Sequence, residues 1–324
     1  MTLFDFFSND WCNLHWTPWN PFSADRNEFR QIPKDPGLYQ IRPVGKDFLM
    51  YIGETRRTLH QRLNELRQSL RREDQMPWND PHTAAPSLWA WRDAESERSS
   101  ELEDEKRHQT SSSAERSSDL EEKKSPSGLF EYECSAAPLD ASQAVRRGME
   151  SFLLYRYRQE YGESTLCNFG RFHKRYRKST NRRENLRGGK LEESQKDNPA
   201  GAPSISPLKV IGRPGDPDWM GLHWAERKTL SSDTIAHVAP GPGLYLLFDT
   251  NSGEILYIGQ SGNCLKRLLD HSRKLWDGKT LQFSSYIDNK IVLPHNLKEL
   301  ENDLIGNFFE IYRKVPEYQF GNNQ

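Results

Sequence analysis

The chain has 324 residues, a formal net charge of −1, 35% apolar residues and a mean hydropathy of −0.89. This length favours about two domains, and the low apolar fraction indicates compact units joined or interrupted by polar chain. No apolar run approaches the roughly 20 residues of a membrane helix. The first residues lack the pattern of a signal peptide, and the four cysteines form no Cys-x-x-Cys pair. We therefore expect a cytoplasmic protein that does not contact membranes.

The first predicted element is a β-hairpin. Gly37-Leu38-Tyr39 lies on its first strand, and Tyr51-Ile52-Gly53, after eleven intervening residues, ends the return strand. A helical pattern carrying Arg62 follows. Residues 93–127 are then rich in Ser, Glu, Asp, Lys and Arg and almost free of apolar residues. Such a segment cannot offset the entropy of ordering, so we expect a disordered insertion there.

A second helical pattern carries Glu150. Its apolar neighbours at helical spacing place the carboxylate on or beside a buried face, where a glutamate is costly unless it is paired or bound to a metal. Asn168 follows eighteen positions later. We assign residues 11–170 to a first domain that contains the insertion.

The segment 171–218 is predicted to be a linker, first basic and then rich in Pro and Gly. Residues 171–190 hold nine Lys or Arg and one Glu. Such a tract can neutralise phosphates, although a solvated linker with incidental charge explains it equally well. The candidate nucleic-acid contacts are Arg171, Lys174, Arg175, Arg177 and Lys178.

The pattern of the first domain returns in residues 219–324, which we assign to a second domain. Gly243-Leu244-Tyr245 and Tyr257-Ile258-Gly259 are separated by the same eleven residues. Chance is a poor account of so many matches in one order, so we expect two copies of one unit. Each is predicted to be an α+β fold, a hairpin-based antiparallel sheet flanked by helices. The residues that follow in the same order are Arg267, Glu301 and Gln319.

The paired triplets, with an arginine, a glutamate and an amide in compatible order, resemble the signature of the GIY-YIG nuclease family, with Leu for the middle Ile. The resemblance implies a metal-dependent endonuclease acting on DNA, with double-stranded DNA favoured. It implies that the tyrosines surround the scissile phosphate and that one helps deprotonate water. The arginine would steady the phosphate, the glutamate would bind Mg²⁺ or Mn²⁺, and the amide would order the site. The implied catalytic residues are Tyr39, Tyr51, Arg62, Glu150 and Asn168, and Tyr245, Tyr257, Arg267, His271 and Glu301, with Glu150 and Glu301 as metal ligands.

The two copies differ at two positions of this pattern. The first has Leu66 where the second has His271, and we interpret the nearby His82 as a structural turn residue. The second has Gln319, one methylene longer than Asn168, which predicts a weaker second site. If both domains are active, no oligomer is required. Two alternatives stay open: the first domain alone is catalytic and the second grips DNA, or the protein binds nucleic acid without cutting it.

Overall fold

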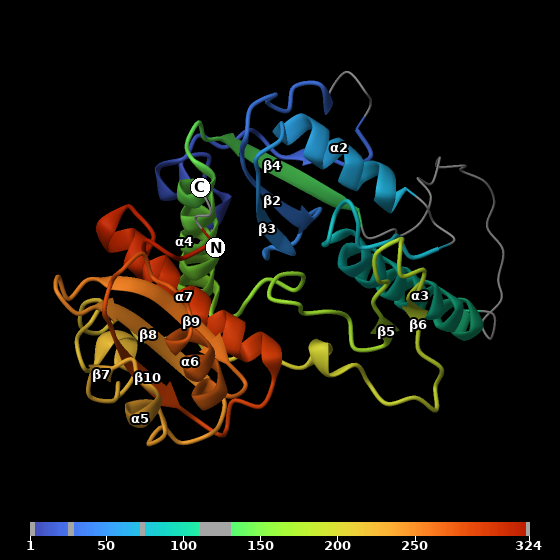
Figure 1. The fold of residues 1–324 in the computed structure, drawn as a ribbon. Coiled ribbons are helices and arrows are strands. Elements are labelled where there is room, and N and C mark those ends of the chain that lie inside the picture. The colour runs from blue at the N-terminus through green and yellow to red at the C-terminus, as the bar shows by residue number, and fades with distance from the viewer. Residues whose placement is uncertain (1–3, 25–28, 72–74, 111–130, 322–324) are drawn as a thin grey trace.

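The structure of the protein is a computed structural model that describes residues 4–24, 29–71, 75–110 and 131–321 (Figure 1). It is a mixed α+β fold with antiparallel sheets, as predicted. The N-terminal part contains two short 3-10 helices, η1 (Asp5–Phe7) and η2 (Trp11–Asn13). Its first sheet has the order β1-β4-β2-β3 and is fully antiparallel. The strands are β1 (Asn20–Pro21), β2 (Gly37–Pro43), β3 (Tyr51–Thr55) and β4 (Tyr132–Pro138), and the helices are α2 (Leu59–Leu70), α3 (Ala85–Thr110) and α4 (Gln143–Tyr161).

The second repeat builds a second antiparallel sheet with the matching order β7-β10-β8-β9. Its central hairpin, β8 and β9, falls where the repeated triplets predict it. Between the sheets the chain forms a small two-stranded ladder, β5-β6, and the 3-10 helix η3 (Pro199–Gly201). The other elements are β5 (Tyr176–Arg177), β6 (Gly189–Lys190), η4 (Trp219–Gly221), β7 (Lys228–Thr229), α5 (Ser232–Ile235), β8 (Gly243–Asp249), β9 (Ile255–Ser261), α6 (Cys264–Ser272), β10 (Leu281–Ile287) and α7 (Pro294–Tyr312).

A tryptophan loop precedes each sheet and repeats in atomic detail. The indole of Trp16 donates to the backbone carbonyl of Trp11 over 3.1 Å, and Trp224 donates to Trp219 over 3.1 Å. The residue after the first tryptophan of each loop has a positive φ of 57° or 58°. The two loops therefore have matching conformations as well as similar sequences.

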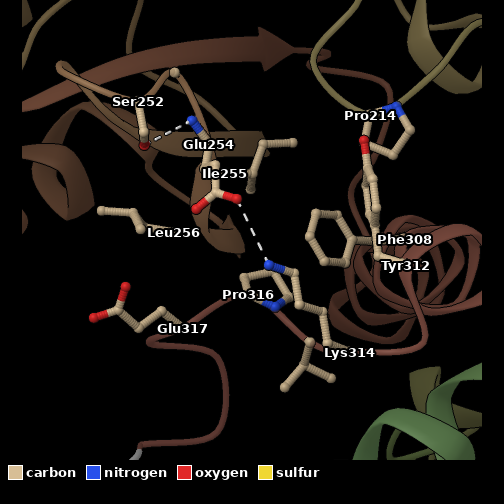
Figure 2. A pocket seen from close by; sticks show the side chains of 12 residues that line it. Pro214, Ser252, Glu254, Ile255, Leu256, Phe308, Tyr312, Lys314, Pro316 and Glu317 are labelled. Atoms are coloured by element: carbon tan, nitrogen blue, oxygen red, sulfur yellow. Dashed lines mark hydrogen bonds and ion pairs between the residues drawn. The ribbon is translucent and has the colours of Figure 1, made fainter.

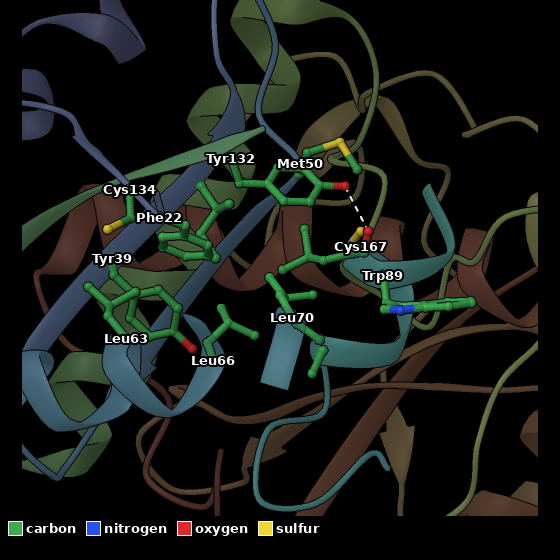
Figure 3. Close-up of a cluster of buried hydrophobic side chains, with 14 of the residues drawn as sticks. Phe22, Tyr39, Met50, Leu63, Leu66, Leu70, Trp89, Tyr132, Cys134 and Cys167 are labelled. Carbon is green, nitrogen blue, oxygen red and sulfur yellow. Dashed lines mark hydrogen bonds between the residues drawn. The ribbon is translucent and has the colours of Figure 1, made fainter. Parts of the chain in front are cut away.

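Each central strand is buried on both faces. In β2, Tyr39 and Ile41 face a core formed with α2 and α3, whereas Leu38 faces a core formed with α4 and the N-terminal residues. Figure 3 shows Tyr39 beside Leu63 within the first of these cores. Strand β8 divides its side chains in the same way between α6 on one face and α7 on the other. The hydroxyl groups of Tyr39 and Tyr245 thereby point towards the helices that carry Arg62 and Arg267, which are α2 and α6.

Helices α4 and α7 pack against each other between the two sheets (Figure 1). Gly306 allows the close approach, because a Cβ atom there would lie 2.3 Å from the Cβ of Tyr155. On one side the rings of Phe152 and Phe309 lie 6.2 Å apart. On the other, Arg158 donates to both carboxylate oxygens of Asp303, over 2.8 and 3.1 Å, with both side chains fully buried.

These contacts follow the repeat. A shift of 151 positions that takes Glu150 to Glu301 also takes Phe152 to Asp303 and Arg158 to Phe309. The Phe152–Phe309 contact and the Arg158–Asp303 ion pair therefore occupy equivalent positions: exchanging the two repeats converts one pair of positions into the other. The two repeats are related across α4 and α7 by an approximate two-fold relation.

Two segments differ from the prediction. Residues 93–110 of the expected disordered insertion continue helix α3, where Glu95 and Arg98 pair at helical spacing (3.5 Å) and Asp93 accepts a hydrogen bond from Tyr176. Residues 111–127 lie outside the described residues. The expected linker 171–218 packs onto the first core through Phe172 and Tyr176, which are 2% and 1% exposed. Aromatic side chains within a polar stretch fix it in place.

Candidate active site

A side-chain amide holds the return strand of each hairpin. Asn168 accepts from the backbone N–H of Ile52 (3.0 Å) and donates to its carbonyl (2.8 Å). Gln319 makes the same two bonds with Ile258, at 2.9 and 3.0 Å. The extra methylene of glutamine is therefore absorbed without displacing the strand. The sequence-based reason for a weaker second site finds no counterpart in this part of the structure.

The glycine of each Tyr-Ile-Gly triplet makes room for the tyrosine rings. A Cβ atom on Gly53 would lie 2.7 Å from the hydroxyl of Tyr39 and 2.6 Å from the ring of Tyr51. The two rings lie 5.9 Å apart, and those of Tyr245 and Tyr257 lie 6.1 Å apart. Any larger residue at the glycine would separate the pair, which explains the invariance of the triplet between the two copies.

The arginine of each repeat reaches its first tyrosine. Nε of Arg62 donates to the hydroxyl of Tyr39 over 3.4 Å, and Nη1 donates to the carbonyl of Pro81 over 2.7 Å. Nε of Arg267 donates to Tyr245 over 3.3 Å. Both arginines are half-buried, so part of each guanidinium stays available for an anion.

A histidine contacts the tyrosine pair in both copies, which the sequence predicted only for the second. Nε2 of His271 lies 2.9 Å from the hydroxyl of Tyr245, and Nε2 of His82 lies 3.2 Å from that of Tyr39. His82 comes from the segment between α2 and α3, whereas His271 lies on α6. The interpretation of His82 as a turn residue missed this contact because His82 has no counterpart in the repeat. One signal could have pointed to it: the first copy has Leu66 at the position of His271, so a histidine from elsewhere in that copy was needed to take its place.

The two histidines differ in the hydrogen bond at their other nitrogen. The backbone N–H of Ala84 donates to Nδ1 of His82 over 3.3 Å. Burial lowers the pKa of His82 well below its usual value, so the ring is neutral near pH 7. Its single proton must then lie on Nε2 and point at Tyr39. Burial also lowers the pKa of His271, to about 4, but among the described residues its buried Nδ1 has no hydrogen-bond partner. Nε2 of His271 can therefore accept a hydrogen bond from the Tyr245 hydroxyl.

The two glutamates are half-buried on the first half of α4 and of α7. Burial raises the pKa of Glu150 to about 8, and the nearby Glu54 raises it further, against Arg147. Burial raises the pKa of Glu301 to about 7, opposed by a hydrogen bond from the backbone of Gln260 and by nearby basic side chains. Both carboxyl groups therefore hold a proton more readily than an exposed glutamate does.

These carboxylates fit a magnesium-type site. Among the described residues, no group of three or more His, Cys, Asp and Glu side chains gathers closely enough to hold a metal ion. Mg²⁺ commonly uses one or two carboxylates and takes its other ligands from water and substrate phosphate, whereas a structural Zn²⁺ requires four protein ligands. Glu150 and Glu301 can therefore serve as single protein ligands. Glu54 adds a second carboxylate near the first site only, since the corresponding residue is Gln260.

The five basic candidates in 171–178 separate into internal and surface residues. Arg171 is 7% exposed and donates to the carbonyl of Ser164 over 2.7 Å. Arg175 donates to Asp197 over 2.9 Å and to three backbone carbonyls of residues 191–195. Arg171 thus ties the segment to the residues before it, and Arg175 cross-links the segment internally. Lys178 is half-buried, and only Lys174 and Arg177 are exposed.

Comparison with protein-family models, curated proteins and solved structures gives no match to this chain. None of the helices described in the structure is long and apolar enough to cross a membrane. The arrangement of the site residues themselves therefore carries the functional argument.

Proposed function

We propose that the protein is a metal-dependent DNA endonuclease with two GIY-YIG-like catalytic units in one chain. One observation carries the proposal: in both copies a histidine meets the tyrosine hydroxyl to which the arginine donates, although the histidine comes from different parts of the sequence. Inheritance from a duplicated ancestor explains the tyrosines and arginines. A second route to the same histidine contact supports a chemical requirement for it.

In this proposal each arginine binds a non-bridging oxygen of the scissile phosphate, since a guanidinium forms two parallel hydrogen bonds with such a group. The tyrosine hydroxyl orients the attacking water. In the second site Nε2 of His271 accepts the hydrogen bond of the Tyr245 hydroxyl, which leaves the lone pairs of this oxygen for Arg267 and the water. In the first, Tyr39 accepts hydrogen bonds from Arg62 and His82, which direct its own proton away from them. A magnesium ion bound by Glu150 or Glu301 would neutralise charge on the phosphate and the leaving oxygen.

The substrate proposed is duplex DNA. Its two strands run antiparallel and are related by a local two-fold axis, and the two units are related by an approximate two-fold relation across α4 and α7. One chain thus presents two sites in opposite senses, which supports cleavage of both strands without an oligomer. The exposed Lys174 and Arg177 would contribute phosphate contacts outside the sites.

The decisive experiment is incubation of supercoiled plasmid with the purified protein, with Mg²⁺ and with EDTA. Linear product that requires Mg²⁺ is expected for the wild type. Glu150→Gln and Glu301→Gln should each give nicked circles, and the double variant no product. Glu310→Gln, on α7 but outside the site, is the matched control and should cut like the wild type. Retention of cleavage by the double variant would refute the proposal. If a single variant still linearises plasmid, the unit that carries the substitution does not cut and is reduced to DNA binding.

A further inference from the structure

A pocket opens in the second repeat at the C-terminal end of α7. It has a volume of about 410 Å³ and lies between this helix end, the β8–β9 turn and residues 314–317. Figure 2 shows the ring of Phe308 and the side chain of Ile255 at its wall, with Lys314 and Glu254 joined across it by an ion pair of 3.6 Å. The volume is within the range of small-ligand sites, roughly 300–1,000 Å³.

The same place in the first repeat is filled by the N-terminal segment Phe4–Phe7. Tyr157 and Tyr161 correspond to Phe308 and Tyr312 by the shift of 151 positions. Phe6 is completely buried, with its ring 4.8 Å from that of Tyr157. The ring of Phe4 lies 5.6 Å from that of Tyr161. Two phenylalanines thus close the end of α4.

The second repeat has no aromatic residue to do this. Phe6 stands five residues before Trp11, and the residue five before the equivalent Trp219 is Pro214. Pro214 lines the pocket and is too small to fill it. As a result Tyr312 remains 45% exposed at the mouth. The pocket therefore lies where the first repeat has the side chain of Phe6.

We propose that this pocket binds a phenylalanine-bearing peptide segment of a partner protein, with an acidic residue next to the phenylalanine. The segment that closes the first repeat has this chemistry, since Asp5 lies between Phe4 and Phe6. The ammonium group of Lys314 stands at the mouth with its side chain 62% exposed, and its ion pair with the equally exposed Glu254 is of the weak surface type. Lys314 is the basic side chain among the lining residues, which also include Glu254 and Glu317, and it would exchange Glu254 for a carboxylate of the incoming peptide.

The pocket is separate from the candidate active site. Tyr312 lies eleven positions after Glu301 on α7, a distance of roughly 16 Å at the helical rise of about 1.5 Å per residue. None of Tyr245, Tyr257 and Glu301 lines the pocket. The inference does not depend on the proposed nuclease function, since it rests on the comparison of the two repeats.

The test uses a fluorescent peptide with the sequence of residues 4–10, FDFFSND, titrated with the full chain. We expect saturable binding, and an affinity about tenfold or more lower for the same peptide with alanine for each phenylalanine. Pro214→Phe places a ring in the pocket from within the chain. It should raise the melting temperature slightly, which shows that the variant is folded, and should abolish binding. Lys314→Glu should weaken binding, and exchange of the peptide's first aspartate for lysine should restore it.

Absence of binding, or undiminished binding to Pro214→Phe, would overturn the proposal. Sedimentation of the wild type alone supplies the other outcome. A dimer that disappears in Pro214→Phe would show that a second copy of this chain fills the pocket, and would likewise overturn a partner protein as the occupant.

Discussion

Removal of the buried guanidinium between α4 and α7 is the sharpest test of how the two repeats are joined. Arg158 is fully buried, as are Asp303 and Glu299, whose carboxylates lie 2.8 and 3.8 Å from it. In Arg158→Met these two acids would face each other in the interior without a counter-charge. Removing one partner of a buried ion pair costs about 3–5 kcal/mol. We expect a loss of that size in the free energy of unfolding, measured by urea denaturation followed by tryptophan fluorescence.

Arg156→Met is the matched control. Arg156 lies on the same helix, pairs with Glu160 and Glu310 at 3.7 and 3.3 Å, and has a side chain that is 38% exposed. A pair of this type contributes about 0–1 kcal/mol. If Arg158→Met costs no more than Arg156→Met, the proposed role of the buried cluster is wrong. Replacing both acids by apolar residues in the Arg158→Met background should recover much of the loss, because no unpaired charge then remains.

Further predictions concern the glutamates, the helix contact and the surface charge. The pKa of Glu150 is about 8 in the folded chain and its ordinary value is 4.5, so the folded chain holds a proton that the unfolded chain releases. The free energy of unfolding should therefore fall as pH rises from about 5 to 8. Over the same pH range the urea midpoint of Glu150→Gln should fall less than that of the wild type. Mg²⁺ at pH 8 should raise the melting temperature of the wild type and leave that of Glu150→Gln/Glu301→Gln unchanged. Gly306→Ala should cost about 1–3 kcal/mol through overpacking, whereas Gly262→Ala, with no atom near the added methyl, should be close to neutral in the same denaturation assay. Arg177→Gln should lower the slope of log affinity for duplex DNA against log salt by about one, and an unchanged slope would remove this residue from the DNA contact surface.

The internal repeat made much of the fold predictable. Two triplets at equal spacing located both hairpins, and the position of Glu150 among apolar residues at helical spacing indicated that its carboxylate is partly buried. The amide eighteen residues later was identified by the resemblance as an ordering group. The structure gives this role a physical form, two hydrogen bonds to one strand residue in each copy.

The remaining features depend on contacts that the repeat does not contain. His82 reaches Tyr39 from a segment present in the first copy only, so no comparison within the chain points to it. Arg171 and Arg175 belong to a tract with the composition of a phosphate-binding segment, but Arg171 donates to the carbonyl of Ser164 and Arg175 to carbonyls of residues 191–195. Arg158 would be assigned to the surface by residue type alone, and only the tertiary structure shows that it lies opposite Asp303.

The α4–α7 interface has an ion pair on one side and an aromatic contact on the other. This difference determines which halves of the chain, the N-terminal half with α4 or the C-terminal half with α7, can pair with each other. In an assembly of two N-terminal halves, Arg158 would lie against Phe152, a buried cation with no acid beside it. In an assembly of two C-terminal halves, Asp303 would lie against Phe309, a buried acid with no base. Only the mixed pair satisfies both contacts. After the two halves diverged to this point, a break in the connecting chain would leave fragments that select the opposite half and reject copies of themselves.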